Sequence, residues 1–164
     1  MFFCRKPVRF VLCLLATAFL FCGRIGAEEP RAILSSEEAE FFVRSVAVAA
    51  EGSMRIDGRD NIKVAAPYDA RVGMIATVLN RLEDLRFPNS VPQIIMSDKT
   101  FSNTASAEKI SDYDMALTYA ALDAALLGFD PTNGALYFST PTNRFNRFVV
   151  TCEMDGYWFG IPVD

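Results

Sequence analysis

The sequence predicts a single α+β domain in which three main helices precede a small antiparallel sheet at the carboxyl end. Apolar residues recur at helical spacing in three segments, and the period changes to two near the end of the chain. The dipeptide Asp155-Gly156, flanked by apolar residues, is typical of a two-residue β-hairpin turn. With 51% hydrophobic residues among 164, the chain has enough apolar surface for one packed core.

The first predicted helix spans residues 36–50. Ser35 and Glu38 form the S-x-x-E pattern of a capping box, apolar residues then share one helical face, and Gly52 is a stop signal. The polar stretch that continues to Ala66 follows neither the helical nor the strand period. We therefore expect an exposed loop there.

Two further long helices and one short helix are predicted in the middle of the chain. Residues 67–85 form one, because Pro67 suits the first helical position and a buried stripe follows it. Residues 111–127 form the other, and their broad surface of Ala, Leu and Met predicts that this helix is central. Between them we expect a short helix at 91–96 and a loop at 97–106.

Three strands are predicted in the last third of the chain, at residues 135–138, 145–154 and 157–161. Counting back from the hairpin turn gives three apolar pairs: Met154 with Tyr157, Cys152 with Phe159, and Val150 with Ile161. We expect these pairs to form the core face of the sheet. Glu153 and Trp158 then share the opposite face.

Residues 1–27 are predicted to be a secretory signal peptide, with cleavage after Ala27 and a mature domain at 28–164. A basic amino-terminal stretch precedes an apolar run from Phe10 to Phe21, and a run of that length is too short to span a membrane as a helix. The expected location is the periplasm or the cell wall, with no stable membrane span after cleavage.

The predicted mature domain is acidic and lacks histidine. Removing the signal peptide takes four of the 16 basic residues and none of the 20 acidic ones, which leaves 12 against 20 and a net charge of −8. That charge disfavours nucleic acid as a partner. The absence of histidine excludes the common serine and cysteine triads and most zinc sites, so we expect neither a metal nor an organic cofactor. Cys152, the only cysteine left, is predicted to be a small core residue.

Glu51, in the last turn of the first predicted helix, is the candidate catalytic residue. Without histidine an enzyme must rely on other groups, and glycan cleavage is a common reaction that needs only carboxylates. A general acid must hold a proton, and the negative end of a helix dipole favours protonated carboxyl groups. On position alone, the alternative is a solvated residue at a helix end.

Five segments together resemble the catalytic domain of the spore-cortex-lytic type of cell wall hydrolase. They are VAAEG (48–52), APYDARVGMIATVLNRL (66–82), RFPNSVPQII (86–95), TFS (100–102) and DPTNGALYFSTP (130–141). The resemblance covers nearly the whole predicted mature domain, in the order that the family has. The block DPTNGALYF is the most specific of the five.

The resemblance implies a lysozyme-like fold and cleavage of peptidoglycan between N-acetylmuramic acid and N-acetylglucosamine. Some members of the family act as lytic transglycosylases, and an essential glutamate closes their first helix, the place that Glu51 holds here. One carboxyl group suffices for that reaction: it protonates the leaving oxygen and then takes the proton of the muramyl 6-hydroxyl as the 1,6-anhydro ring closes. Glycan strands are thus the expected partner.

The sequence departs from the family pattern at two places. Family members usually follow the glutamate almost directly with the Pro-Tyr segment, so residues 52–65 resemble an insertion relative to the family. Gly156-Tyr157 stands where the family tends to carry Gly-Asn-His. Any role of that histidine is predicted to be lost or to pass to Tyr157. The alternative function is therefore a catalytically silent domain that binds peptidoglycan. A secreted domain unrelated to glycan would require a chance match of the DPTNGALYF block.

Five further residues are predicted to contact the substrate. Phe101 and Ser102 stand where the family places a loop that lines the cleft. In the alternative interpretation, Phe101 is a core aromatic residue and Ser102 is a serine in a turn. Asn133 belongs to a turn signal that shapes the backbone. Tyr137 extends from the strand that follows, or packs in the sheet. Trp158 is suited to stacking on a pyranose ring, and its alternative role is to cover a helix.

Overall fold

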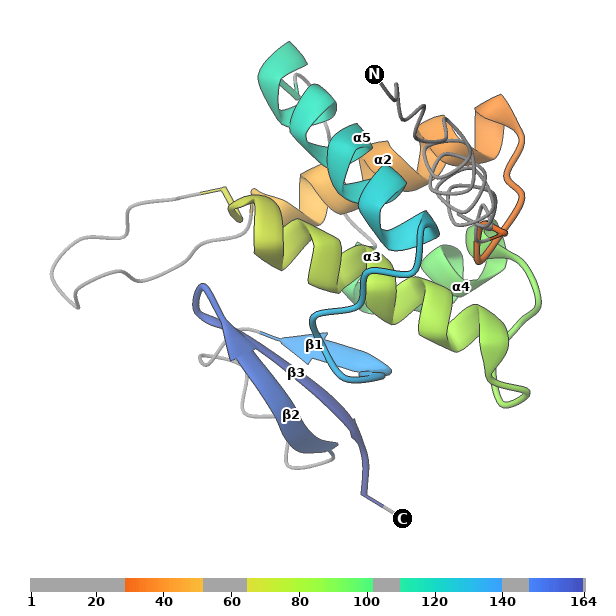
Figure 1. The fold of residues 1–164 in the computed structure, drawn as a ribbon, viewed down its shortest axis with the longest axis vertical. Helices are drawn as coiled ribbons and strands as arrows, with labels where there is room; N and C mark the ends of the chain where they lie inside the picture. The colour runs from red at the N-terminus through yellow and green to blue at the C-terminus, as the bar shows by residue number, and fades with distance from the viewer. Residues whose placement is uncertain (1–28, 52–64, 102–109, 140–147, 164) are drawn as a thin grey trace, which may run out of the picture.

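The computed structural model describes residues 29–51, 65–101, 110–139 and 148–163. Within these ranges, helices precede a three-stranded antiparallel sheet that lies beside α3 (Figure 1). The elements are α2 (Ser36–Ala50), α3 (Tyr68–Glu83), α4 (Val91–Ser97), α5 (Asp112–Leu126), β1 (Tyr137–Ser139), β2 (Phe148–Met154) and β3 (Tyr157–Pro162). The predicted α+β fold, with its sheet at the carboxyl end, is confirmed.

Helix α2 begins and ends at the predicted residues. Ser35 is the N-cap: its hydroxyl accepts from the Glu38 N–H at 3.2 Å, and its own N–H donates to the Glu38 carboxylate at 2.9 Å. This reciprocal pair satisfies donors that every helix start leaves open. A local sequence signal therefore determines where α2 starts.

The central helix is α3, so the expectation that residues 111–127 form it was wrong. Every residue of α3 from Ala70 to Leu79 is buried, whereas α5 buries only Thr118, Ala121, Leu122 and Ala125. Those four positions form a single helical stripe. The apolar composition of α5 was misleading because Tyr113, Ala116 and Ala120 face solvent.

The middle of the chain otherwise follows the prediction closely. The short helix α4 extends one residue beyond the predicted range 91–96. Helix α3 ends at Glu83 instead of near Leu85, because Asp84 is already extended with ψ at 120° and Leu85 is fully exposed. Most of the predicted loop at 52–66 lies outside the described residues.

Strands β2 and β3 pair as predicted only next to their turn. Met154 pairs with Tyr157 and Cys152 with Phe159, but a β-bulge between Val150 and Cys152 then shifts the register by one residue. The predicted pairing of Val150 with Ile161 is therefore wrong: Val150 faces Gly160, and Val150 and Ile161 are 46% and 40% exposed. A one-residue shift moves side chains to the opposite face of a sheet.

Thr151, the residue inside the bulge, explains why the bulge forms. The Thr151 hydroxyl donates to the Thr132 carbonyl at 2.9 Å, a contact with a segment 19 residues away. Gly160 allows the strands to approach at this point, because a Cβ there would lie 2.2 Å from the Val149 carbonyl oxygen. Long-range packing thus overrides the simple count from the hairpin turn.

The first strand starts later than predicted, at Tyr137 instead of residue 135. Asn133 and Gly134 have φ values of 58° and 78°, so the turn before the strand occupies the left-handed region. The Asp130 carboxylate accepts the Gly134 N–H at 3.0 Å and stabilises that turn. The segment 145–147 of the second predicted strand lies outside the described residues.

The sheet packs against α3 through a close contact at Gly73. A Cβ at this glycine would lie 2.8 Å from the Phe159 ring. The turn between β2 and β3 lies toward the amino-terminal end of α3, and β1 begins beside the other end (Figure 1). There, Nε of Arg81 near the end of α3 donates to the Leu136 carbonyl just before β1. The sheet therefore extends along α3 from one end of the helix to the other.

Candidate active site

Glu51 forms the C-cap of α2. Its N–H donates to the carbonyls of Ala47 and Val48, each at 3.2 Å, which anchors its backbone to the last helical turn. Its side chain is exposed to solvent. A carboxyl group on a fixed backbone, accessible from outside, is a suitable arrangement for proton exchange with a large substrate.

The backbone beside Glu51 is held by the residue that leads into α3. The N–H of Ala66 donates to the Ala50 carbonyl at 2.7 Å, and the Ala66 carbonyl accepts from Nε of Arg71 at 2.7 Å. Carbonyls at a helix end lack partners within the helix, so the first of these bonds completes the end of α2. The end of α2 and the start of α3 are thereby joined.

The Arg71 side chain is completely buried and extends the same network to α5. Its Nη1 donates to the Thr118 hydroxyl at 2.6 Å, and its Nη2 forms an ion pair with the Asp114 carboxylate. The hydrogen bond from the Ser111 hydroxyl, and then the contact with Arg71, hold the pKa of Asp114 below its usual value against the effect of burial. Three helices therefore meet next to Glu51.

Tyr157 begins β3 at the hairpin turn, at the same end of α3. Its side chain is only 2% exposed, and its hydroxyl has no hydrogen-bond partner among the described residues. Burial raises the pKa of the Tyr157 phenol, and the positive charge of Arg71 opposes that shift. A buried hydroxyl without a partner is unusual in folded proteins, which makes Tyr157 a candidate for contact with a bound molecule.

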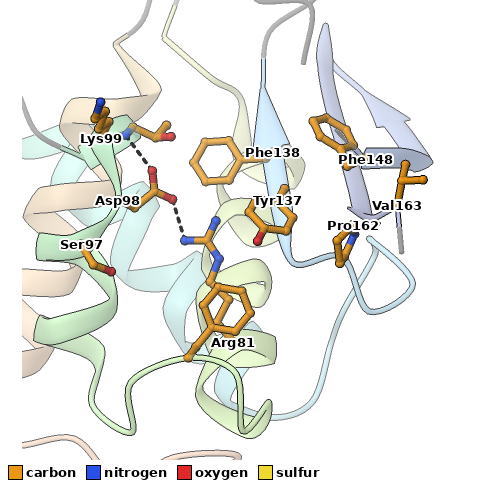
Figure 2. A pocket seen from close by; sticks show the side chains of 11 residues that line it. Arg81, Ser97, Asp98, Lys99, Tyr137, Phe138, Phe148, Pro162 and Val163 are labelled. Atoms are coloured by element: carbon orange, nitrogen blue, oxygen red, sulfur yellow. Dashed lines mark hydrogen bonds and ion pairs between the residues drawn. The ribbon is translucent and has the colours of Figure 1, made fainter. Parts of the chain in front are cut away.

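A groove of about 830 Å³ lies at the other end of α3, between α4 and the sheet (Figure 2). Tyr137 and Phe138 of β1 lie between its two sides. Arg81 also lines it, donating to the Leu136 carbonyl and to the Asp98 carboxylate, each at 2.6 Å. The groove beside Tyr137 is thus separate from the Glu51 end of α3.

The structure distributes the remaining predicted site residues over several environments. Phe101 is 2% exposed and packs edge-on against Phe138, with ring centroids 5.7 Å apart, while Ser102 lies outside the described residues. Asn133 is exposed in its turn. Trp158 is partly exposed and pairs with Glu153 on one side and Ser139 on the other. Substrate contact by these residues stays a prediction.

The described part of the chain also bears on metal binding and on membrane crossing. No three Cys, Asp or Glu side chains gather there as a metal site would require. None of the helices described is long and apolar enough to cross a membrane.

Comparison with known proteins identifies the family. The sequence pattern of the Cell Wall Hydrolase family matches residues 65–159, which is more than half of the chain. The chain belongs to this family. The resemblance inferred from the sequence is therefore confirmed, and the match extends from the residue before Ala66 to Phe159 in β3.

The curated relatives of this cell wall hydrolase are spore cortex-lytic enzymes. That of Bacillus cereus is 32% identical over 85 residues, which are 52% of this chain and 32% of the relative. That of Bacillus subtilis is 36% identical over 83 residues, which are 51% of this chain and 27% of the relative. The matched region thus spans about a third of the length of these relatives.

Two solved structures share the fold of this cell wall hydrolase. The catalytic domain of the germination-specific lytic transglycosylase SleB from Bacillus anthracis has a TM-score of 0.59 at 21% identity, covering 77% of this chain and 96% of that domain. The catalytic domain of the Bacillus cereus SleB protein has a TM-score of 0.60 at 20% identity, covering 84% and 99%. The predicted lysozyme-like fold is confirmed.

Sequence reasoning missed the buried arginines of this cell wall hydrolase. A signal for Arg71 was present, because it is in phase with Ile75, Val78 and Leu82 on one face of α3. A cation in a buried stripe requires a partner. The sequence does not show that this partner is Asp114, 43 residues further along the chain.

Proposed function

We propose that this cell wall hydrolase cleaves the glycan strands of peptidoglycan between N-acetylmuramic acid and N-acetylglucosamine, by lytic transglycosylation. Membership of the family supports a wall substrate. The relatives are named spore cortex-lytic enzymes, and one protein of the same fold is named a germination-specific lytic transglycosylase. These names support cleavage of the glycan strand as the reaction.

The observation that carries the proposal is the position of Glu51. Its carboxyl group is exposed at the end of α2, while the Ala50 carbonyl before it is bonded to Ala66 and, through Ala66, to the buried Arg71. A general acid needs a carboxyl group that the substrate can reach and a backbone that holds it in place. The family match begins at residue 65, directly beside this contact in space.

The proposed reaction uses Glu51 twice. As the glycosidic bond breaks, the Glu51 carboxyl group gives its proton to the leaving oxygen of N-acetylglucosamine. The resulting carboxylate then accepts the proton of the muramyl 6-hydroxyl, whose oxygen bonds to the anomeric carbon and closes a 1,6-anhydro ring. Glu51 recovers its proton in this second step. The reaction therefore consumes no water and requires no second carboxylate.

The substrate contacts and the location of the protein belong to the same proposal. Tyr157 is next to the Glu51 end of α3 and takes over any role of the family histidine. Phe101, Ser102, Asn133, Tyr137 and Trp158 are proposed to shape or contact the glycan. Residues 1–27 direct export, which brings the mature domain to a wall-associated or periplasmic substrate.

Mass spectrometry of the soluble products from purified peptidoglycan tests this function. We expect anhydromuramyl fragments from the mature protein and none from Glu51→Gln, which keeps the size of the side chain and removes its acid proton. Reducing ends from the wild type would replace transglycosylation with hydrolysis. Equal release of fragments by both proteins would exclude Glu51 as the acid.

A second candidate function is a catalytically silent domain that binds peptidoglycan. The observation in its favour is that the family match starts at residue 65 and leaves Glu51 outside it. Co-sedimentation with purified peptidoglycan separates the two functions when it is combined with product analysis. A silent domain would sediment equally before and after Glu51→Gln and would release no fragments.

A further inference from the structure

We infer that the groove at the carboxyl-terminal end of α3 is a binding subsite for N-acetylhexosamine units of a glycan. The groove has a volume of about 830 Å³, within the range of small-molecule sites. Its lining comes from three separate parts of the fold: the end of α4, the end of α3 and the sheet (Figure 2). For the identity of the glycan, the inference rests on the proposed function.

One lining residue, Tyr137, offers a fixed aromatic surface. The Arg81 guanidinium carbon lies 5.2 Å from the centre of the Tyr137 ring and 5.4 Å from that of Phe87. The Phe148 ring is nearly parallel to Tyr137, with an interplanar angle of 13° and centroids 6.4 Å apart. Tyr137 is nevertheless 36% exposed. A ring that is held in place before binding loses little entropy when a ligand stacks on it.

The groove also has two sides of different character. Phe148, Pro162 and Val163 form an apolar side, and Ser97 and Asp98 stand on the opposite, polar side (Figure 2). A pyranose ring has an apolar face and hydroxyl groups at its edge, so it matches such a pair of surfaces.

The charge of Arg81 does not direct the groove toward an anion. Its Nη1 lies 2.6 Å from the Asp98 carboxylate, and its Nε donates to the Leu136 carbonyl. Burial works against ionisation of Asp98, but the Arg81 charge and the hydrogen bonds from Thr100 and Arg81 prevail and lower its pKa. Asp98 is therefore ionised at neutral pH and compensates Arg81, which favours an uncharged ligand such as a saccharide.

The groove is too far from Glu51 to be the place where the bond breaks. Tyr68 begins α3 beside Ala66 and the end of α2, whereas Arg81 is thirteen residues further along the helix. That separation corresponds to about 20 Å along the axis of a helix. The groove would hold sugar units distant from the scissile bond, so the enzyme should prefer long glycan strands to short ones.

Titration with N-acetylchitotetraose, observed by isothermal calorimetry and by protein NMR, tests the inference. The titration uses Glu51→Gln protein, so binding is measured without cleavage and without assuming that the wild type is active. Tyr137→Ala removes the aromatic surface and is expected to weaken binding about tenfold. Tyr137→Phe keeps the ring and should bind like the parent. Tyr113→Ala, which removes an exposed aromatic residue on α5 away from the groove, should also bind normally.

A second variant covers the case in which Tyr137→Ala fails to fold. Val163→Trp adds bulk to the apolar side at a residue that is 60% exposed, and it should block the saccharide without disturbing the core. Equal binding by the parent, Tyr137→Ala and Val163→Trp, or no binding by the parent, would overturn the inference. Displacement of the saccharide by inorganic phosphate at similar concentration would also overturn the inference, because it would indicate an anion site. Phosphate is the relevant competitor because Lys99 also lines the groove.

The design separates failure of the subsite from failure of the proposed function. If the saccharide binds and Tyr137→Ala weakens it, the subsite stands even when wild-type protein releases no fragments from peptidoglycan. If fragments are released but their rate depends equally on strand length in wild type and Val163→Trp, the enzyme stands and the subsite does not.

Discussion

Arg71 and Asp114 form an ion pair across the interface of α3 and α5, and the Arg71 side chain is completely excluded from water. The same guanidinium donates to the Ala66 carbonyl and the Thr118 hydroxyl. Buried charges persist in proteins when they are paired and hydrogen-bonded in this way. The pair therefore fixes α3 against α5 and, through Ala66, holds the backbone that precedes Glu51.

Replacing Arg71 by Met is expected to lower the free energy of unfolding by about 3 kcal/mol. The substitution supplies an apolar chain of similar length but removes the Arg71 donor from the Ala66 carbonyl and from the Asp114 carboxylate, which keeps its hydrogen bond from the Ser111 hydroxyl. Urea unfolding should show a lower midpoint at an unchanged slope. Arg71→Lys should recover part of the loss, because it restores the charge but not the planar set of donors.

The matched control for this substitution is Arg44→Met on α2. Arg44 pairs with Glu40 one helical turn away at 3.5 Å, and both side chains are about half exposed. Exposed pairs of this kind contribute little to stability, so no measurable change in the urea midpoint is expected. Equal effects of the two substitutions would contradict a special role for the buried pair.

Gly73→Ala is expected to destabilise the protein, although alanine usually stabilises the interior of a helix by about 1 kcal/mol. The added Cβ would lie 2.8 Å from Phe159 and 3.1 Å from the Thr132 methyl group. Phe159 is fully buried, so overpacking should cost about 1–3 kcal/mol. Thermal unfolding measures the sign. The cost should shrink when Phe159→Leu is present, and a rise in Tm in the wild-type background would refute the contact.

The parts of the fold that could be predicted from the sequence are those whose signals are local. The start of α2 depends on Ser35 and Glu38, three residues apart, and the first pairs of the hairpin depend on Asp155-Gly156. The position of Glu51 at the end of a helix follows from the same local signals. These features were therefore predicted to within a residue.

The parts that were mispredicted depend on distant contacts. The bulge in β2 is fixed by the hydrogen bond from Thr151 to Thr132 and by the space that Gly160 leaves, neither of which a count from the turn includes. The bonds from Arg71 to Asp114 and from Arg81 to Leu136 and Asp98 join residues 17 to 55 positions apart. Spacing along one helix shows that such arginines are buried but does not identify their partners.

The stability of the protein should fall in acid because several carboxyl groups have lowered pKa values. For Asp98, burial opposes the shift, but the charge of Arg81 and hydrogen bonds from Thr100 outweigh it. The unfolded chain then binds more protons than the folded one as pH falls below the ordinary aspartate value of 3.8. The contribution to stability is therefore complete at pH 6 and is lost as pH falls through the folded pKa.

Asp98→Asn isolates this contribution. The variant should be less stable than wild type at pH 6, because Arg81 keeps its charge and loses its carboxylate. The two proteins should approach one another in acid, where the wild-type carboxyl group becomes neutral as well. Urea midpoints from pH 6 down to about pH 2.5 measure the difference. A constant gap over that range would show that the pair with Arg81 has no titrating role.

The last prediction separates chemistry from folding at Glu51. Because the side chain is exposed, Glu51→Gln should leave the urea midpoint unchanged, yet it should lower the rate of fragment release by about 10²- to 10⁴-fold if the carboxyl group is the general acid. Glu37→Gln is the matched control, since Glu37 is an exposed glutamate in the first turn of the same helix and should affect neither quantity. Glu51→Asp keeps the acid but shortens the side chain by one methylene group, so its rate should lie between those of wild type and Glu51→Gln. A rate for Glu51→Asp equal to that of wild type would contradict a requirement for exact placement of the carboxyl group, which Ala66 and Arg71 are expected to provide by holding the end of α2.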